Sequence, residues 1–316
     1  MCPGEALSQF VTIDYAPNET KHEDSFCYDF SREELHLLAV FDGCGGLGSR
    51  RYSRLENKTG AFIAAQSCAR LIEQWQEQVT PEMLADHQQL AESFMTRIVK
   101  QLSFLESKYA DDNKLMGTMV RTMPCTASIA LVHPGENDRT LSLTTMSAGD
   151  SRVYILTAED GLQQVTRDEL RGNPDAMANL YVSAPLSNVV NIDVPFTMQT
   201  RRMDMGRPFA VLTATDGVFG YVRTPMDFER ILLDSLAMAS TFAEFESAFQ
   251  REVTAISGDD ATAVMGFYGW KNFKGMKRAF VRRRAYVDKL CQELDANHTD
   301  EAMESAWQAY KPTAYI

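Results

Sequence analysis

The sequence predicts an α+β fold. Two blocks of short apolar or alternating segments are expected to form β-strands: residues 8–15, 25–30 and 35–41, then residues 125–132, 141–147 and 152–157. Two long amphipathic segments lie between these blocks. Strands grouped in blocks and interrupted by paired helices are typical of α+β proteins rather than of strictly alternating α/β proteins.

The first long amphipathic segment, residues 59–78, predicts a helix whose apolar face carries Phe62, Ala65, Leu71 and Trp75. Pro81 occupies a favoured first-turn position and Thr80 precedes it as an N-cap, so a second helix is expected from Pro81 to about Tyr109. Its apolar stripe consists of Leu84, Leu90, Phe94, Ile98 and Leu102.

The second half of the chain begins with a hairpin turn predicted at Glu159-Asp160-Gly161. Residues 168–195 carry several prolines and no clear periodicity, which is typical of a functional loop. The remaining elements are expected as strands near 196–203 and 208–215, helices near 226–236 and 241–255, and a strand at 261–268.

The tail, residues 270–316, differs in composition from the rest of the chain. Its first half is basic, its second half is acidic, and its apolar residues recur near helical spacing. One interpretation is a helix that packs its apolar face on the domain and leaves its basic face in solvent. The other is a helix that binds a partner or an anionic surface.

The overall composition limits the classes of function. The 316 residues, of which 45% are hydrophobic and 23% charged, are typical of a globular protein with a sizeable core. A net charge of −12 argues against non-specific nucleic-acid binding. The six cysteines show no C-x-x-C spacing, and neither a signal peptide nor a membrane span is visible, so a cytoplasmic protein is expected.

Acidic residues stand at the ends of several apolar runs. Residues 37–41 lead into Asp42-Gly43, residues 209–215 lead into Asp216-Gly217, and Asp259-Asp260 precedes the run 261–265. Each pair alone is explained by a plain turn, because Asp and Gly both favour turns. Carboxylates gathered at strand ends repel one another, however, and Mg²⁺ or Mn²⁺ would cancel that repulsion with oxygen ligands.

The ordered set of motifs resembles the protein phosphatase 2C family of metal-dependent serine/threonine phosphatases. The set is Glu23-Asp24, Asp42-Gly43-Cys44-Gly45-Gly46, Ala148-Gly149-Asp150-Ser151-Arg152, Asp216-Gly217 and Asp259-Asp260. The resemblance implies a phosphatase domain over residues 1–269, followed by a helical extension over 270–316. It also implies a four-layer α-β-β-α sandwich, in which two antiparallel sheets are flanked by helices.

The activity that the resemblance implies is hydrolysis of phosphoserine or phosphothreonine in a phosphorylated protein substrate. Two Mg²⁺ or Mn²⁺ ions, with a weaker third, would hold a bridging hydroxide that attacks the phosphate. Asp42, Asp216 and Asp259 are the implied catalytic residues. The implied metal ligands are these three together with Glu23, Asp24, the carbonyl of Gly43, and Asp150 at the third ion. Asp260 is expected outside the direct ligand set.

The chain also departs from the family pattern. Many members have His where this chain has Cys44, and an Arg that holds phosphate before the Glu-Asp pair is absent here. Lys21 or the run Arg50, Arg51 and Arg54 are candidate replacements. Cys44 followed by Arg50 superficially suits a cysteine phosphatase, but the acidic neighbours disfavour a thiolate. These departures keep open an alternative function: a weakly catalytic module with a phosphatase fold, which binds a phosphoprotein or a regulatory partner.

Overall fold

The computed structural model describes residues 9–110, 120–137, 140–172, 175–181, 184–297 and 299–316. The prediction that the N-terminus carries no signal peptide falls largely on residues 1–8, which lie outside these ranges. So do the first position of the strand predicted at 8–15 and parts of the loop predicted at 168–195. All other predicted elements fall within the described part of the chain.

Two five-stranded antiparallel sheets form the centre of the molecule. The first contains, in spatial order, β1 (Gln9–Tyr15), β12 (Ala261–Tyr268), β11 (Phe209–Ala214), β8 (Arg152–Thr157) and β9 (Gly161–Gln164). The second contains β10 (Gln199–Gly206), β7 (Thr140–Ala148), β6 (Ala127–Pro134), β3 (Leu35–Phe41) and β2 (Ser25–Arg32). The predicted strands are therefore confirmed, with small shifts at their ends.

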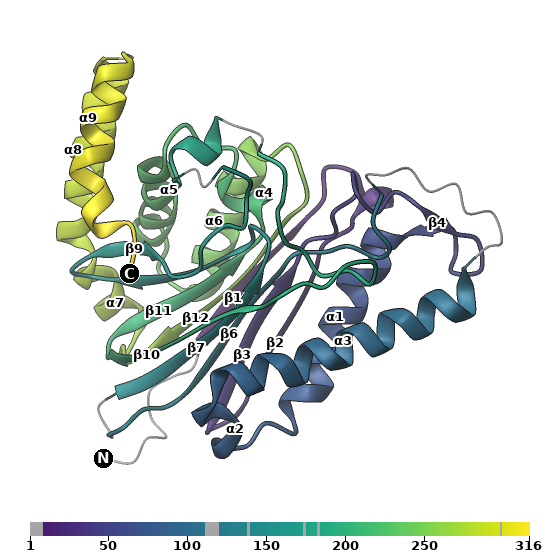
Figure 1. Cartoon of the computed structure of the whole chain (residues 1–316). Helices are drawn as coiled ribbons and strands as arrows, with labels where there is room; N and C mark the ends of the chain where they lie inside the picture. The colour runs from purple at the N-terminus through teal and green to yellow at the C-terminus, as the bar shows by residue number, and fades with distance from the viewer. Residues whose placement is uncertain (1–8, 111–119, 138–139, 173–174, 182–183, 298) are drawn as a thin grey trace.

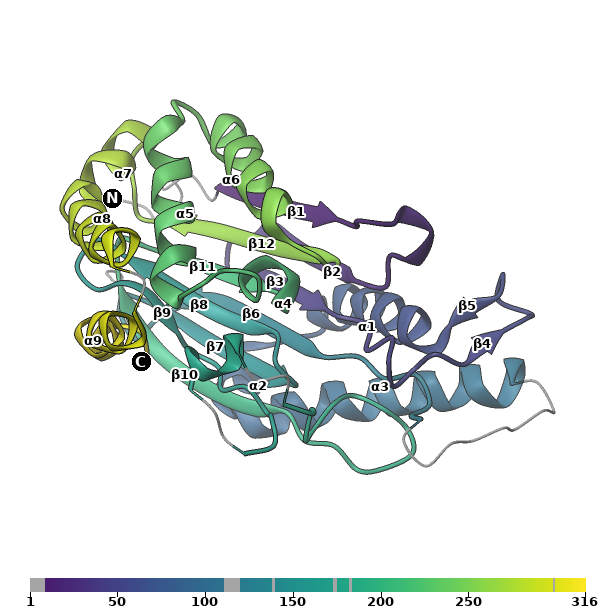
Figure 2. The same ribbon diagram turned by 90° about the horizontal axis from the view of Figure 1, so that it is seen from above.

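The sheets pack face to face over an apolar core that includes Leu38, Val153, Val211 and Val264. Helices α5 (Pro225–Met238) and α6 (Phe242–Ile256) cover the outer face of the first sheet. Helices α1 (Gly60–Gln76) and α3 (His87–Tyr109) cover the outer face of the second sheet (Figures 1 and 2). This confirms the four-layer sandwich, since the inner strands β3, β6, β8, β11 and β12 are buried along almost their whole length.

The helix predicted from Pro81 to Tyr109 is two helices, which corrects the prediction. Thr80 caps α2 (Pro81–Ala85) as expected, but α2 ends at Asp86. The Asp86 side chain then accepts a hydrogen bond from the Gln89 amide at 3.0 Å and so caps α3. The apolar stripe from Leu84 to Leu102 is buried as predicted, because the break preserves its position.

The buried face of α1 also differs from the prediction. Trp75 and Ala65 are buried, but Phe62 and Leu71 are only partly buried. Ile63, Cys68 and Ile72 occupy the buried stripe instead. The predicted face was based on the large apolar residues of the helix. The face that lies against the sheet is a neighbouring stripe, which includes small residues of the helix.

Several short elements were not predicted. A small antiparallel hairpin, β4 (Arg51–Tyr52) and β5 (Lys58–Thr59), precedes α1. Asp216, predicted in a turn, begins the one-turn helix α4 (Asp216–Phe219). The 3₁₀ turns η2 (Glu19–Lys21) and η3 (Ala178–Leu180) lie in the β1–β2 loop and in the predicted irregular segment.

The tail forms three helices rather than one: α7 (Phe273–Ala279), α8 (Val281–Ala296) and α9 (Asp300–Tyr310), followed by the turn η4 (Lys311–Thr313). Phe273, Met276, Val287, Leu290 and Leu294 are buried in the same core as α5 and α6. The tail is therefore packed on the domain, which is the first of the two arrangements considered from the sequence.

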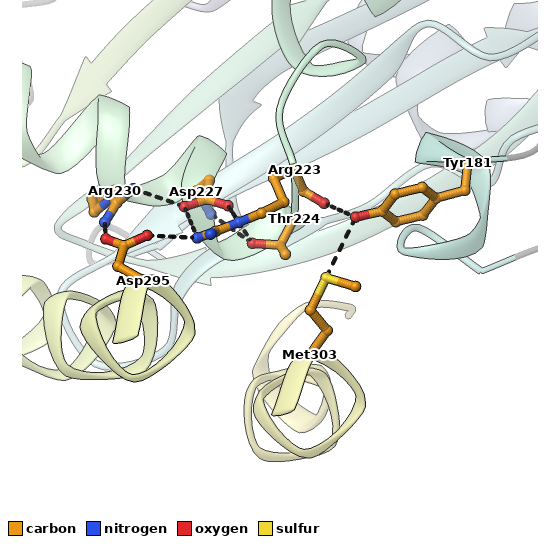
Figure 3. Close-up of polar contacts among 7 residues, drawn as sticks. All are labelled: Tyr181, Arg223, Thr224, Asp227, Arg230, Asp295 and Met303. Atoms are coloured by element: carbon orange, nitrogen blue, oxygen red, sulfur yellow. Dashed lines mark hydrogen bonds and ion pairs between the residues drawn. The ribbon is translucent and has the colours of Figure 1, made fainter. Parts of the chain in front are cut away.

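Polar contacts hold the tail to α5 and to the irregular segment (Figure 3). Asp295 of α8 pairs with Arg223 and Arg230, each at 3.0 Å. The Tyr181 hydroxyl donates to the Arg223 carbonyl at 2.6 Å and lies 3.7 Å from the sulfur of Met303 in α9. The tail therefore contacts both the helical layer and the loop beside it.

A buried ion pair lies beneath these surface contacts. The guanidinium of Arg283 donates to Glu229 of α5 at 2.7 and 2.8 Å. The hydroxyl of Tyr310 donates to the same carboxylate at 2.5 Å. Removing one member would leave a buried charge without its partner, which is strongly destabilising, so this cluster fixes the position of α8 and α9.

Membrane crossing by a helix has no support in the described part of the chain, where every helix is too short or too polar for it.

A substitution in α8 tests whether the tail is part of the core. We expect Leu294→Ala to lower the free energy of unfolding by about 2–5 kcal/mol, because Leu294 is 1% exposed and its loss leaves a cavity. Gln292→Ala, at an exposed position of the same helix, is the control and should change it by less than about 0.5 kcal/mol. Urea denaturation of both variants measures the difference, and equal midpoints would mean that the tail does not pack in solution.

Candidate metal centre

The acidic motifs meet at one end of the sandwich, in an open cavity of about 980 Å³. Its acidic lining residues come from four separate parts of the chain: Glu23, Asp42, Asp216, and Asp259 with Asp260. The backbone of the segment 42–47 forms another part of the wall. Sequence-distant carboxylates are therefore brought into one site.

Each sheet delivers one of the two central aspartates. Asp42 directly follows β3 of the second sheet, where its amide is 3.3 Å from the Thr126 hydroxyl and its carbonyl accepts the Thr126 amide at 2.8 Å. Asp216 follows β11 of the first sheet and begins α4. Because buried strands lead to both positions, the backbones that carry the two carboxylates are fixed at the same end of the sandwich.

The β1–β2 loop adds the Glu23-Asp24 pair. The Glu23 amide donates to Asp260 at 2.7 Å, and the Thr59 hydroxyl donates to the Glu23 carboxylate. Asp24 is 2% exposed and accepts a hydrogen bond from the Thr215 hydroxyl at 2.9 Å. Glu23 therefore faces the cavity, whereas Asp24 lies behind its wall.

Two glycines allow the segments of the site to approach closely. A Cβ on Gly43 would lie 2.6 Å from the Glu23 carbonyl oxygen, and a Cβ on Gly217 would lie 1.8 Å from the Asp260 carbonyl oxygen. Both contacts are with backbone, which cannot swing away as a long side chain could. The glycines of the two Asp-Gly motifs are therefore needed for packing within the site as well as for turning the chain.

The carboxylates of the site raise one another's pKa values. Burial, and then repulsion by Asp24 and Asp216, holds the pKa of Asp42 well above its usual range. Burial, followed by repulsion from Asp216, raises the pKa of Asp150 to about 8. Burial and Asp259 raise the pKa of Asp216 to about 6. The site is therefore deficient in positive charge.

The structure gathers most of the predicted ligands, but not all of them in the cavity. Glu23, Asp42, Gly43, Asp216 and Asp259 line it, as does Asp260. Asp24 and Asp150 lie outside its wall. Both are still close to cavity residues, because Asp24 raises the pKa of Asp42 and Asp216 raises the pKa of Asp150. Within the described residues, no three Asp, Glu, His or Cys side chains are arranged to hold a metal ion as they stand.

The donor set nevertheless fits a hard divalent cation. All the acidic groups offer oxygen, which Mg²⁺ and Mn²⁺ prefer. Their raised pKa values show that the charged forms are held together at a cost, which a cation placed among them would remove. Small side-chain rotations within the cavity would be needed, since the carboxylates are not yet gathered around one point.

Cys44 lines the cavity beside Asp42 but is poorly suited to be a nucleophile. Burial, and then the negative charges of Asp42 and Asp150, raise the pKa of its thiol well above the usual range. Its sulfur lies 3.9 Å from the Asp42 carbonyl oxygen. A neutral thiol in an acidic environment is a weak nucleophile.

Two functional candidates were not identified from the sequence. Thr59, the N-cap of α1, also donates to Glu23, and Lys58 lines the cavity beside Phe62. Neither residue stands in a recognisable motif, and the two-residue strand that carries them has no periodicity to detect. Of the arginines considered as phosphate ligands, Arg50 instead pairs with Glu106 at 2.7 Å.

A sandwich of this topology with an acidic site at one end is the architecture of the metal-dependent phosphatases. The profile of the protein phosphatase 2C family matches residues 17–253. The chain belongs to this family. No curated protein sequence matches the chain.

The solved structures with similar folds include two bacterial phosphatases. The serine/threonine phosphatase Stp1 from Staphylococcus aureus aligns with a TM-score of 0.61 and 17% identity, covering 84% of this chain and 96% of that one. PstP/Ppp from Mycobacterium tuberculosis aligns with a TM-score of 0.57 and 15% identity, covering 83% and 99%. The catalytic domain of PstP in complex with two manganese ions gives a TM-score of 0.55, with 14% identity and coverage of 83% and 98%. At these identities the likeness establishes the fold.

Substitution of the two central aspartates tests the metal centre. We expect Asp42→Asn and Asp216→Asn each to weaken Mn²⁺ binding more than about 100-fold. Loss of a group that only hydrogen-bonds a metal ligand already costs about 10- to 100-fold, and loss of a ligand should cost more. Calorimetric titration with Mn²⁺ measures this change. Asp160→Asn, in the exposed β8–β9 turn, removes the same charge and should leave the affinity unchanged. Wild-type affinity in either cavity variant would remove that residue from the ligand set.

Proposed function

We propose that this protein is a Mg²⁺- or Mn²⁺-dependent phosphatase that hydrolyses phosphoserine or phosphothreonine in protein substrates. The observation that carries the proposal is the meeting of Glu23, Asp42, Asp216 and Asp259 in one open cavity of a protein phosphatase 2C fold. The manganese ions of the PstP catalytic domain, a protein of similar fold, support the same chemistry.

Each residue of the cavity has a role in this proposal. Asp42, which is near several of the other carboxylates, would be the ligand shared by the ions, and the carbonyl of Gly43 would be a ligand beside it. Asp216 and Asp259 would help to hold one ion, and Glu23, with Asp24 behind it, would help to hold the other. Asp150 would serve a weaker third ion. Bound Mg²⁺ or Mn²⁺ supplies positive charge to the phosphoryl oxygens and lowers the pKa of water.

The protein matrix contributes orientation. Thr59 and Asp260 hold Glu23 from two sides, and Thr126 fixes the backbone at Asp42. The open cavity admits a side chain of a protein substrate together with its phosphate. The free cysteines among the described residues suit a reducing compartment, so a cytoplasmic location is part of the proposal.

A second candidate function is a module that binds phosphoproteins and turns them over poorly. Cys44 favours it, because a thiol with a raised pKa is a poor proton donor to a leaving oxygen at the position where many family members have His. Both candidates require the cavity to bind phosphate, and they differ in turnover.

Hydrolysis assays separate the two candidates. We expect the wild-type protein to release phosphate from an aryl phosphate and from a phosphothreonine peptide in Mn²⁺ or Mg²⁺, and to lose this activity in a chelator, because the carboxylates need cations. Restoration of activity by added metal is the control for denaturation. Peptide binding without metal-dependent phosphate release would favour the binding module.

Replacement of Cys44 tests the identity of the nucleophile. We expect Cys44→Ser to keep most of the metal-dependent turnover, because water rather than the thiol attacks. Steady-state kinetics with the aryl phosphate measures this, and Cys68→Ser, at a buried cysteine outside the cavity, is the control for packing effects. Loss of turnover in Cys44→Ser with normal Mn²⁺ affinity would contradict the mechanism.

A further inference from the structure

The cavity has an acidic floor and a basic wall. Besides the carboxylates, its lining includes Lys21 from the β1–β2 loop and Arg51 and Lys58 from the β4–β5 hairpin. A phosphate dianion entering the cavity approaches carboxylates that already repel one another. Fixed cations facing this floor would therefore attract and orient the incoming anion.

The hairpin that carries two of these cations is firmly attached to the domain. Tyr52, opposite Lys58 in the hairpin, is fully buried, and its hydroxyl donates to Glu106 of α3 at 2.6 Å. Thr59, opposite Arg51, caps α1 and donates to Glu23. The hairpin is thus tied to a helix on one side and to the acidic floor on the other. Figure 2 shows it at the same end of the sandwich as the β1–β2 loop.

Arg51 and Lys58 form no ion pair with a carboxylate of the described residues. Among the ion pairs of the described residues, none includes either side chain. One nitrogen of Arg51 donates to the Asn57 carbonyl at 2.8 Å, which orients the guanidinium across the hairpin. The Lys58 ammonium lies 4.3 Å from the centre of the Phe62 ring, which also lines the cavity.

Arg51 also lies beside the acidic residues of the cavity. It lines the cavity together with Glu23, and Thr59, opposite Arg51 in the hairpin, donates to the Glu23 carboxylate. The other arginines of this region are placed differently: Arg50 is paired with Glu106, and Arg54 does not line the cavity. Arg51 is therefore the arginine of this run that lines the cavity.

We propose that the β4–β5 hairpin forms the phosphate-binding subsite of this chain, with Arg51 as the main anion ligand and Lys58 as a second charge. This assignment rests on the proposed function, which identifies the anion as the phosphate of the substrate. A guanidinium matches two phosphate oxygens with parallel hydrogen bonds, whereas the Lys58 ammonium acts as a point charge. The subsite supplies an arginine, which the segment before Glu23 lacks.

Direct binding of inorganic phosphate to the Mg²⁺-loaded protein tests the subsite. We expect Arg51→Ala to weaken phosphate binding about 10- to 100-fold, since it removes charge-assisted hydrogen bonds. Arg51→Lys should recover part of the loss, and Lys58→Gln should show a smaller loss. Arg54→Ala is the matched control, because it removes the same side chain from the same hairpin outside the cavity. Calorimetry with phosphate measures the affinities, and titration with Mg²⁺ checks that the metal sites are intact.

Steady-state kinetics adds a second readout. We expect Arg51→Ala to raise the KM for a phosphothreonine peptide, and the inhibition constant of phosphate, by similar factors. Equal phosphate affinity in Arg51→Ala and Arg54→Ala would overturn the subsite, as would a wild-type protein that binds no phosphate when loaded with Mg²⁺. A wild-type protein that binds phosphate through Arg51 but releases none from the peptide would instead refute the proposed activity and leave the subsite standing.

Discussion

Mutual repulsion among buried carboxylates is the constraint on which the candidate site depends. Asp24, Asp42, Asp150 and Asp216 come from different strands and loops, yet each has a pKa raised by burial and, in part, by another acidic group. Left to themselves, such groups would separate or take up protons. The fold keeps the backbones that carry Asp42 and Asp216 in place, because these residues follow β3 and β11, which are inner strands of packed sheets.

The chain manages this repulsion in part with neutral hydrogen bonds and in part with one buried cation. Thr215 donates to Asp24, Thr59 donates to Glu23, and the Asp260 carboxylate accepts the Glu23 amide. Arg152 lowers the pKa of Asp216, but its guanidinium is held by Asp168 of the irregular segment at 2.6 Å. The charge of Arg152 is therefore largely balanced by Asp168, and the carboxylates of the cavity remain suited to binding external cations.

Most of the fold could be predicted because it depends on long periodic segments. The buried strands and α5 and α6 follow from apolar runs, and the order of acidic motifs led to the family. The break at Asp86 could not be predicted, because the apolar stripe continues across it and capping by one side chain decides it. Strands as short as β4 and β5 carry no periodic signal, so Lys58 and Thr59 were missed. Asp24 shares its motif with the cavity residue Glu23, whereas no residue of the motif around Asp150 lines the cavity, and a motif does not say which side of a wall a side chain faces.

The two kinds of charge in the site have different structural origins, and this affects how each can vary. The carboxylates stand next to strands or pack against glycines, as Gly217 does against the Asp260 backbone, so their positions are tied to the core. The cations stand on a short hairpin and a loop, attached through Tyr52 and Thr59. A change in the hairpin can therefore alter which anions are attracted without disturbing the sheets that hold the carboxylates. In this chain the hairpin lies at the end of the sandwich far from the tail helices, so the packing of the tail on α5 and the charge of the hairpin are physically separate features (Figures 1 and 2).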